Sequence, residues 1–159
     1  MNKKINISII GTRGYPYIYS GYETFVKHLS ERLVLKDCNV TIYCHRGLFK
    51  IRPKKIKGIK LVYIPTIETK ILSQPIHSFF SIIHACFSNI DVVLVVNSAN
   101  GPFGLITRLF KIPSAINVDG LEWQRFGRLA MLVLFDGTIK CVLHERAFAA
   151  TGDASHEAK

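Results

Sequence analysis

The segment between a predicted first strand and the helix after it carries residues that could hold an anion. Gly11 and Gly14 flank Thr12 and Arg13, and Gly21 begins the predicted helix. Glycines let backbone N–H groups approach a phosphate, and a helix N-terminus adds partial positive charge. Arg13 could add a bidentate contact. The spacing matches neither the dinucleotide fingerprint nor the P-loop, so simple turn geometry remains the alternative.

A second candidate follows the predicted fifth strand, in the segment 117–123. Asn117, Asp119, Glu122 and Trp123 bring an amide, two carboxylates and an indole to one strand end. This combination suits a sugar, because hydroxyl groups need acceptors and the faces of a sugar ring stack on aromatic side chains. Asp119 and Glu122 also have the spacing of a capping box, so a purely structural role remains the alternative.

The third candidate is the segment 97–102 after the most apolar strand. Asn97 and Asn100 can hydrogen-bond a ligand or simply shape the turn. We expect His77 and His84 to be core or surface residues rather than ligands.

No motif for a metal or an organic cofactor is present, so the sequence predicts neither. Cys44 and His45 are adjacent but do not make a zinc site. The second strand ends in His45 and Arg46 instead of an acidic residue, which disfavours nicotinamide cofactors.

Alternating strand and helix patterns place these segments at strand ends. The predicted fold is α/β, with a Rossmann-like, mostly parallel sheet and helices on both faces. The three candidate segments then share the carboxyl edge of that sheet. The predicted strands cover 5–10, 40–44, 60–64, 91–96 and 114–118, and the predicted helices cover 22–33, 74–89, 102–110 and a stretch from 127 onward.

Composition and charge narrow the function classes. The chain has 159 residues, of which 48% are hydrophobic, and neither a membrane-length apolar run nor a signal peptide is apparent. We therefore expect a soluble, cytoplasmic protein. The net charge is +10, and the segment 46–60 carries seven basic residues and no acidic one. Such a block favours nucleic acid, an anionic membrane surface or a phosphorylated substrate, with a solvated loop as the alternative.

Five segments together resemble one family. They are IGTRGYP at 10–16, GYETFVKHLSERL at 21–33, VTIYCHR at 40–46, DVVLVVNSANGPF at 91–103 and NVDGLEWQR at 117–125. The chain resembles the N-terminal domain of bacterial GT-B glycosyltransferases of family 4, in the rhamnosyltransferase-like branch of capsule and O-antigen synthesis. The resemblance covers about residues 5 to 130.

The resemblance implies retaining transfer of rhamnose or another hexose from a nucleotide-sugar donor to a lipid-linked glycan acceptor. It implies a peripheral location on the inner face of the cell membrane and no nucleic-acid partner. It also implies a site role for each matching residue. Gly11, Arg13, Gly14 and Gly21 would lie near the donor phosphates, Asp119 and Glu122 would be catalytic, and Asn97, Asn100, Asn117, Trp123 and Arg125 would bind the acceptor.

The same resemblance predicts a domain division. Residues 1–130 would form the acceptor-side half of a GT-B fold, and 131–159 an atypical tail. The donor domain would be missing, so we expect this chain alone to be inactive. The rival hypothesis is a non-enzymatic basic α/β module that binds nucleic acid or an anionic membrane surface, although no recognised nucleic-acid motif supports it.

Overall fold

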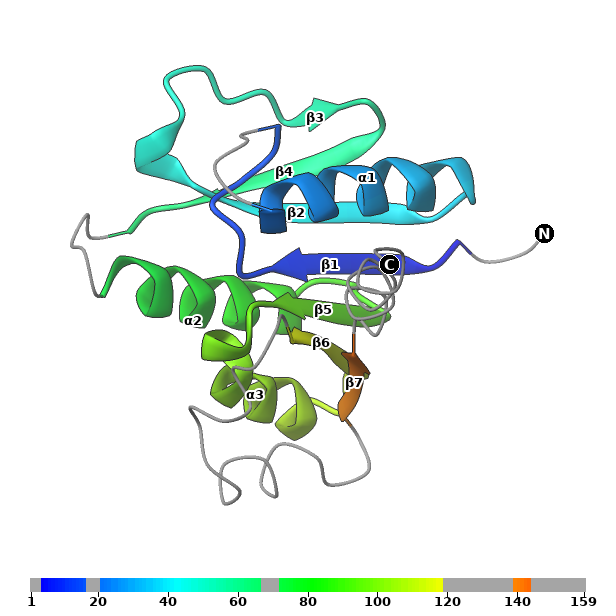
Figure 1. Cartoon of the computed structure of the whole chain (residues 1–159), viewed down its shortest axis with the longest axis vertical. Helices are drawn as coiled ribbons and strands as arrows, with labels where there is room; N and C mark the ends of the chain where they lie inside the picture. Colours follow the sequence, from blue (N-terminus) through cyan, green and yellow to red (C-terminus); the bar gives the residue numbers. More distant parts are fainter. Residues whose placement is uncertain (1–3, 17–20, 67–71, 119–138, 144–159) are drawn as a thin grey trace, which may run out of the picture.

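The computed structural model describes residues 4–16, 21–66, 72–118 and 139–143 (Figure 1). Within them, seven strands form one sheet in the order β3-β4-β2-β1-β5-β6-β7. Neighbouring strands are parallel except β3 and β4, which form an antiparallel hairpin. The predicted α/β fold with a mostly parallel sheet is confirmed. The strands are β1 (Asn6–Ile10), β2 (Asn39–His45), β3 (Lys55–Ile56), β4 (Ile59–Ile64), β5 (Val92–Val96), β6 (Ser114–Val118) and β7 (Ile139–Leu143).

Helices cover both faces of this sheet. Because successive side chains of a strand point to opposite faces of the sheet, Ile9 of β1 lies on one face and Ile10 on the other. Ile9 packs with Val26 of α1, whereas Ile10 packs with Ile82 of α2. The α-helices are α1 (Gly21–Leu35), α2 (Ser73–Cys86) and α3 (Gly104–Leu109), and two short 3₁₀ helices span Arg46–Leu48 and Ser98–Phe103.

The basic segment 46–60 is more structured than a loop. Lys55 pairs with Lys60, and Ile56 pairs with Ile59, across the β3–β4 hairpin. Lys57 and Gly58 make the turn with positive φ angles of 47° and 82°, which suits a two-residue hairpin connection. Two residues are too short a strand to leave a periodic signal, so the sequence pattern did not reveal β3.

The carboxy-terminal part of the sheet also differs from expectation. Strand β7 lies parallel to β6, although its residues fall in the segment 131–159 predicted as an atypical tail. The helix expected from residue 127 lies outside the described residues. The domain division at residue 130 stays a prediction.

Helix α2 has one buried and one exposed apolar face. Ile82 and Ala85 are fully buried against the sheet, whereas Phe80 is 51% exposed and Phe87, the residue directly after the helix, is 77% exposed. The Phe87 ring makes an edge contact with Phe110, with the ring centres 5.4 Å apart. Among the residues that the structure describes, no helix has the length and apolarity needed to cross a membrane.

Candidate functional site at the carboxyl edge of the sheet

The loop after β1 is shaped by two glycines that the fold itself requires. Gly11 has a φ of +102°, and a Cβ there would lie 2.1 Å from the Val96 carbonyl oxygen. Gly14 has a φ of +139°, and a Cβ there would lie 2.6 Å from the Phe49 ring. A Cβ at Gly21, in contrast, would meet no atom within 4 Å. Turn geometry and close packing therefore account for Gly11 and Gly14, while Gly21 leaves open space at the start of α1.

Arg13 connects this loop to α1 and β2 through its backbone. Its N–H donates to Oε1 of Glu23 at 3.3 Å, and its carbonyl accepts from the His45 N–H at 3.1 Å. Glu23 is buried in the first turn of α1, where a carboxylate interacts favourably with the helix dipole. Beside Arg13, Thr12 is 1% exposed, and its Oγ1 has no hydrogen-bond partner within the described ranges.

His45, at the end of β2, stacks on His77 of α2. The ring centres are 3.9 Å apart and the planes meet at 20°. Oγ of Ser73, the first residue of α2, lies 3.5 Å from Nδ1 of His45. His77 is fully buried, and neither of its ring nitrogens makes a hydrogen bond in the part of the chain that the structure covers. Burial, assisted by the proximity of His45, lowers the pKa of His77 to about 3, so this imidazole is neutral at physiological pH.

The sequence analysis missed this pair as site residues. It expected His77 to be a core or surface residue, and burial confirms the core position. It gave His45 no role in binding. The two residues are far apart in the chain, and only the crossover from β4 into α2 brings the start of that helix over the end of β2. A histidine as the last residue of a buried strand was the available signal.

The two predicted asparagines after β5 stand in different situations. Asn97 has a positive φ of 77°, and its carbonyl accepts from the Asn100 N–H at 3.1 Å. The Asn100 side chain is 1% exposed. Its Oδ1 accepts from Oγ of Ser78 at 2.8 Å, and its Nδ2 donates to the Val96 carbonyl at 3.0 Å. Asn100 thus connects α2 to the end of β5.

Other contacts complete this edge. Nε2 of Gln74 in α2 donates to the Gly11 carbonyl at 2.9 Å, so the glycine loop is held from the α2 side as well. Asn117 is buried near the end of β6, beside Val96. The edge thus gathers Gly11, Arg13 and Gly14 with the asparagines of the β5 and β6 ends. The remaining predicted site residues, Asp119, Glu122, Trp123 and Arg125, lie outside the described residues.

Comparison with known proteins gives no family and a weak likeness to a solved structure. No family model matches the sequence, and no curated protein matches it. The chain is similar to the crystal structure of phenylacrylic acid decarboxylase from Aquifex aeolicus, with 17% sequence identity and a TM-score of 0.41, covering 89% of this chain and 81% of that one. A likeness at this level carries no conclusion about the activity of this chain.

These findings correct the family drawn from the sequence. The assignment to GT-B glycosyltransferases is corrected here, because no family model and no curated protein matches the sequence. Sugar transfer, and with it the rhamnosyltransferase and polysaccharide-synthesis roles, is likewise contradicted. Of the enzyme prediction, only the coarse form, that the chain belongs to an enzyme, is kept, and it is kept as a proposal. The five segments that carried the resemblance are short. Several of their residues, such as Gly11 and Gly14, are needed at the turns of any sheet of this kind, so they do not identify a family.

Proposed function

We propose that this chain is the ligand-binding domain of an enzyme and that it binds a phosphorylated small molecule at the carboxyl edge of its sheet. Ligands of open α/β sheets characteristically bind in this position. The nucleotide-type partner expected from the sequence is kept here only as a phosphate-bearing ligand, without sugar transfer.

The observation that carries the proposal is a group of unpaired polar atoms at this edge. Thr12 follows β1, Thr66 follows β4, and His77 lies in the early part of α2. Their side-chain oxygens and ring nitrogens are buried and have no hydrogen-bond partner among the described residues. More than about 90% of buried polar groups in proteins are paired, and leaving one unpaired costs about 1–3 kcal/mol. A bound ligand at this edge would supply the missing partners.

The charges around the edge favour an anion. Helices α1 and α2, of 15 and 14 residues, both begin after strands that end at this edge, so their N-termini contribute partial positive charge. No side chain caps the first turn of α2 at Leu72. Arg13 adds a full positive charge. Glu23 is the opposing carboxylate, and its Oε1 accepts the Arg13 N–H, which lowers its repulsion of a phosphate.

Each residue then has a definable part in binding. The Thr12 hydroxyl would donate to a phosphate oxygen, and Arg13 would balance its charge. The neutral His77 ring would hold His45 in place by stacking.

Calorimetric titration with adenosine, guanosine and uridine diphosphates tests the proposal. We expect at least one to bind, and Thr12→Val to weaken that binding about tenfold, since a hydrogen bond to a charged group contributes about 1.5–3 kcal/mol. The melting temperature of Thr12→Val should match the wild type, because Oγ1 makes no hydrogen bond within the described residues.

The matched control is Ser81→Ala. Ser81 is also buried with an unpaired hydroxyl, but it lies one turn farther along α2 than His77. The Ser81→Ala variant should bind the diphosphate with the affinity of the wild type. Absence of binding by all three diphosphates, or equal affinity in Thr12→Val, would refute the proposal.

A further inference from the structure

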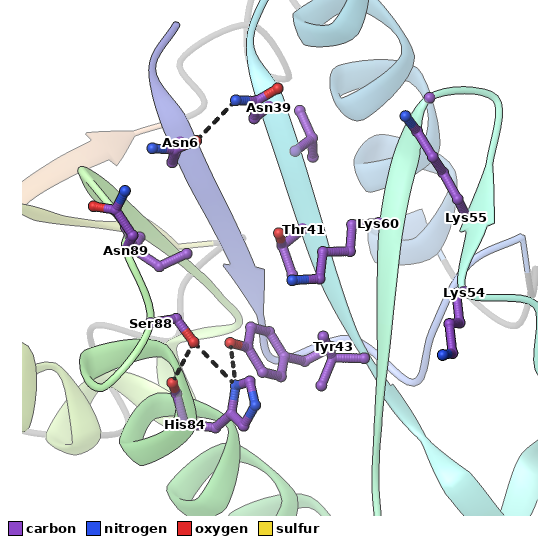
Figure 2. A pocket seen from close by; sticks show the side chains of 14 residues that line it. Asn6, Asn39, Thr41, Tyr43, Lys54, Lys55, Lys60, His84, Ser88 and Asn89 are labelled. Carbon is purple, nitrogen blue, oxygen red and sulfur yellow. Dashed lines mark hydrogen bonds between the residues drawn. The ribbon is translucent and has the colours of Figure 1, made fainter.

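We infer a second binding site, for a ligand with at least two phosphate charges, at the opposite end of the sheet. A pocket of about 510 Å³ lies there, within the usual size of small-molecule sites, about 300–1,000 Å³. Figure 2 shows its lining side chains. The pocket is lined by Asn6, Asn39, Val40, Thr41, Tyr43, Lys54, Lys55, Gly58, Lys60, Val62, His84, Ser88, Asn89 and Ile90.

The register places this pocket away from the carboxyl edge. Asn6 opposes Asn39 where β1 and β2 begin, and Thr41 opposes Lys60 near the start of β4. Tyr43 and Val62 belong to the α2 side of the core. The pocket thus lies on the α2 face, at the amino ends of three strands. It shares no residue with the glycine loop or the stacked histidines, so this inference does not depend on the proposed function.

Three lysines give the pocket its charge. Lys55 and Lys60 are directly opposed across the hairpin, an arrangement that destabilises a sheet when both side chains carry the same charge. Lys54 precedes them, and in Figure 2 the Lys60 side chain extends over β2 toward Thr41. No carboxylate lines the pocket, and no ion pair involves these three lysines within the described residues. A multiply charged anion would relieve this repulsion.

Lys57, on the same hairpin, differs from these three lysines because a carboxylate neutralises its charge. Its Nζ lies 3.0 Å from Oε1 of Glu31 on α1, and it does not line the pocket. Glu31 also accepts from the Tyr15 hydroxyl at 2.8 Å. The carboxylate on this side of the hairpin is therefore engaged away from the pocket.

Another wall of the pocket carries polar side chains that are hydrogen-bonded to one another. The Tyr43 hydroxyl lies 3.0 Å from Nδ1 of His84, and burial raises the pKa of Tyr43 to about 12. Tyr43 therefore stays protonated and can donate to Nδ1 of His84. Ser88 donates to the His84 carbonyl at 2.8 Å. The lysines supply the positive charge that a phosphate group needs, and the polar side chains of Tyr43, His84 and Ser88 line another wall of the pocket (Figure 2).

The amides at the upper end of the pocket suit the polar remainder of such a ligand. Nδ2 of Asn39 donates to Oδ1 of Asn6 at 2.9 Å. The side-chain oxygen of Asn39, Oδ1, can then accept a hydrogen bond from a ligand. The neighbouring carboxylate, Asp91, accepts both the backbone and the side-chain N–H of Asn6, at 2.8 and 3.1 Å. Its charge is thus directed to Asn6 rather than into the pocket. The ligand class is a diphosphate or a doubly phosphorylated polar molecule.

Residue-resolved NMR with inorganic pyrophosphate tests this site. We expect the amide signals of Thr41, Lys60 and Ser88 to shift on titration. The double variant Lys55→Gln/Lys60→Gln should bind pyrophosphate at least tenfold more weakly. The matched control Lys50→Gln/Lys57→Gln removes the same charge from the same segment outside the pocket and should change affinity less than twofold.

Three outcomes would overturn the inference. Shifts confined to the loop around Thr12 would place the anion at the other edge, and Thr12→Val serves as the check because it should leave the Thr41 shift intact. Equal losses in both double variants would mean a general charge attraction. If Lys55→Gln/Lys60→Gln lost flotation with phosphatidylserine vesicles yet bound pyrophosphate normally, the lysines would form a membrane-facing surface instead.

Discussion

The imidazole of His77 lies flat against that of His45, with 3.9 Å between the ring centres. His45 is the last residue of β2, and His77 lies in the first half of α2. Two charged imidazoles could not hold this geometry, because like charges at such a distance in a buried site repel strongly. The stack therefore requires at least one neutral ring, and the fully buried His77 is that ring.

This arrangement makes stability depend on pH. His77 in the unfolded chain takes up a proton near pH 6.5, whereas burial, together with His45, lowers its pKa in the folded chain to about 3. Above pH 6.5 neither state is protonated, and below it the unfolded state alone gains a proton. We expect the free energy of unfolding to fall by about 1.4 kcal/mol per pH unit from this residue as the pH drops from 6 to 4.

Urea unfolding at pH 6, 5 and 4 measures the effect. His77→Phe keeps a ring against His45 but cannot bind a proton, so its pH dependence should be shallower by that amount. His28→Gln, which changes an exposed histidine on α1, should retain the wild-type slope. An unchanged slope in His77→Phe would mean that another group controls the acid sensitivity.

Two serines on the buried side of α2 provide a matched stability test. Ser78 and Ser81 are both fully buried, but Ser78 donates to Oδ1 of Asn100 at 2.8 Å, whereas Ser81 has no partner among the described residues. Ser78→Ala leaves a buried acceptor unpaired and should cost about 1–3 kcal/mol. Ser81→Ala removes an unpaired hydroxyl and should be neutral or stabilising. Thermal unfolding of the two variants decides the matter, and equal losses would contradict the hydrogen-bond assignment.

The lysine pair of the hairpin gives a further stability prediction. Because Lys55 and Lys60 are directly opposed without a carboxylate beside them, Lys60→Gln should raise the melting temperature at low ionic strength. The gain should shrink in salt, which screens the repulsion over about 10 Å at 0.1 M. Lys50→Gln is the control and should change little. A melting temperature lowered by Lys60→Gln at every salt concentration would contradict the repulsion.

Periodic patterns were sufficient to predict most of the sheet. Runs of apolar, β-branched residues predict five of the strands, which are β1, β2, β4, β5 and β6. Such a run is visible in the sequence whichever helix packs on the strand. Strand β3 is two residues long and begins with a lysine, so it depends on pairing with β4 rather than on its own sequence. The chemistry at the ends of the strands was harder to predict, since it depends on which helix crosses which strand.

The candidate site was predicted only in part for the same reason. The glycine loop was found because glycines between a strand and a helix can be recognised in the sequence. The reason for Gly11 and Gly14, however, is their close approach to Val96 and Phe49, and these two residues are distant in sequence. His45 and His77 meet only after the sheet has formed. The resemblance to glycosyltransferases failed because it rested partly on turn glycines and strand-end asparagines. Such residues are needed by the geometry of the fold, whatever reaction a protein with that fold carries out.

The glycines of the loop therefore offer the clearest separation of fold from function. Gly11→Ala should unfold the chain or lower its melting temperature severely, because the φ of +102° is strained for alanine and its Cβ would lie 2.1 Å from the Val96 oxygen. Gly21→Ala meets no atom within 4 Å, and alanine is a better helix former by up to about 1 kcal/mol. It should leave stability unchanged or raise it slightly. If the open space at Gly21 receives the ligand, the bulkier Gly21→Val should lose diphosphate binding while keeping its melting temperature within a few degrees of Gly21→Ala. Thermal unfolding combined with calorimetric titration of the three variants measures both effects. Normal binding by Gly21→Val would remove the start of α1 from the site and leave Thr12 and Arg13 to hold the phosphate.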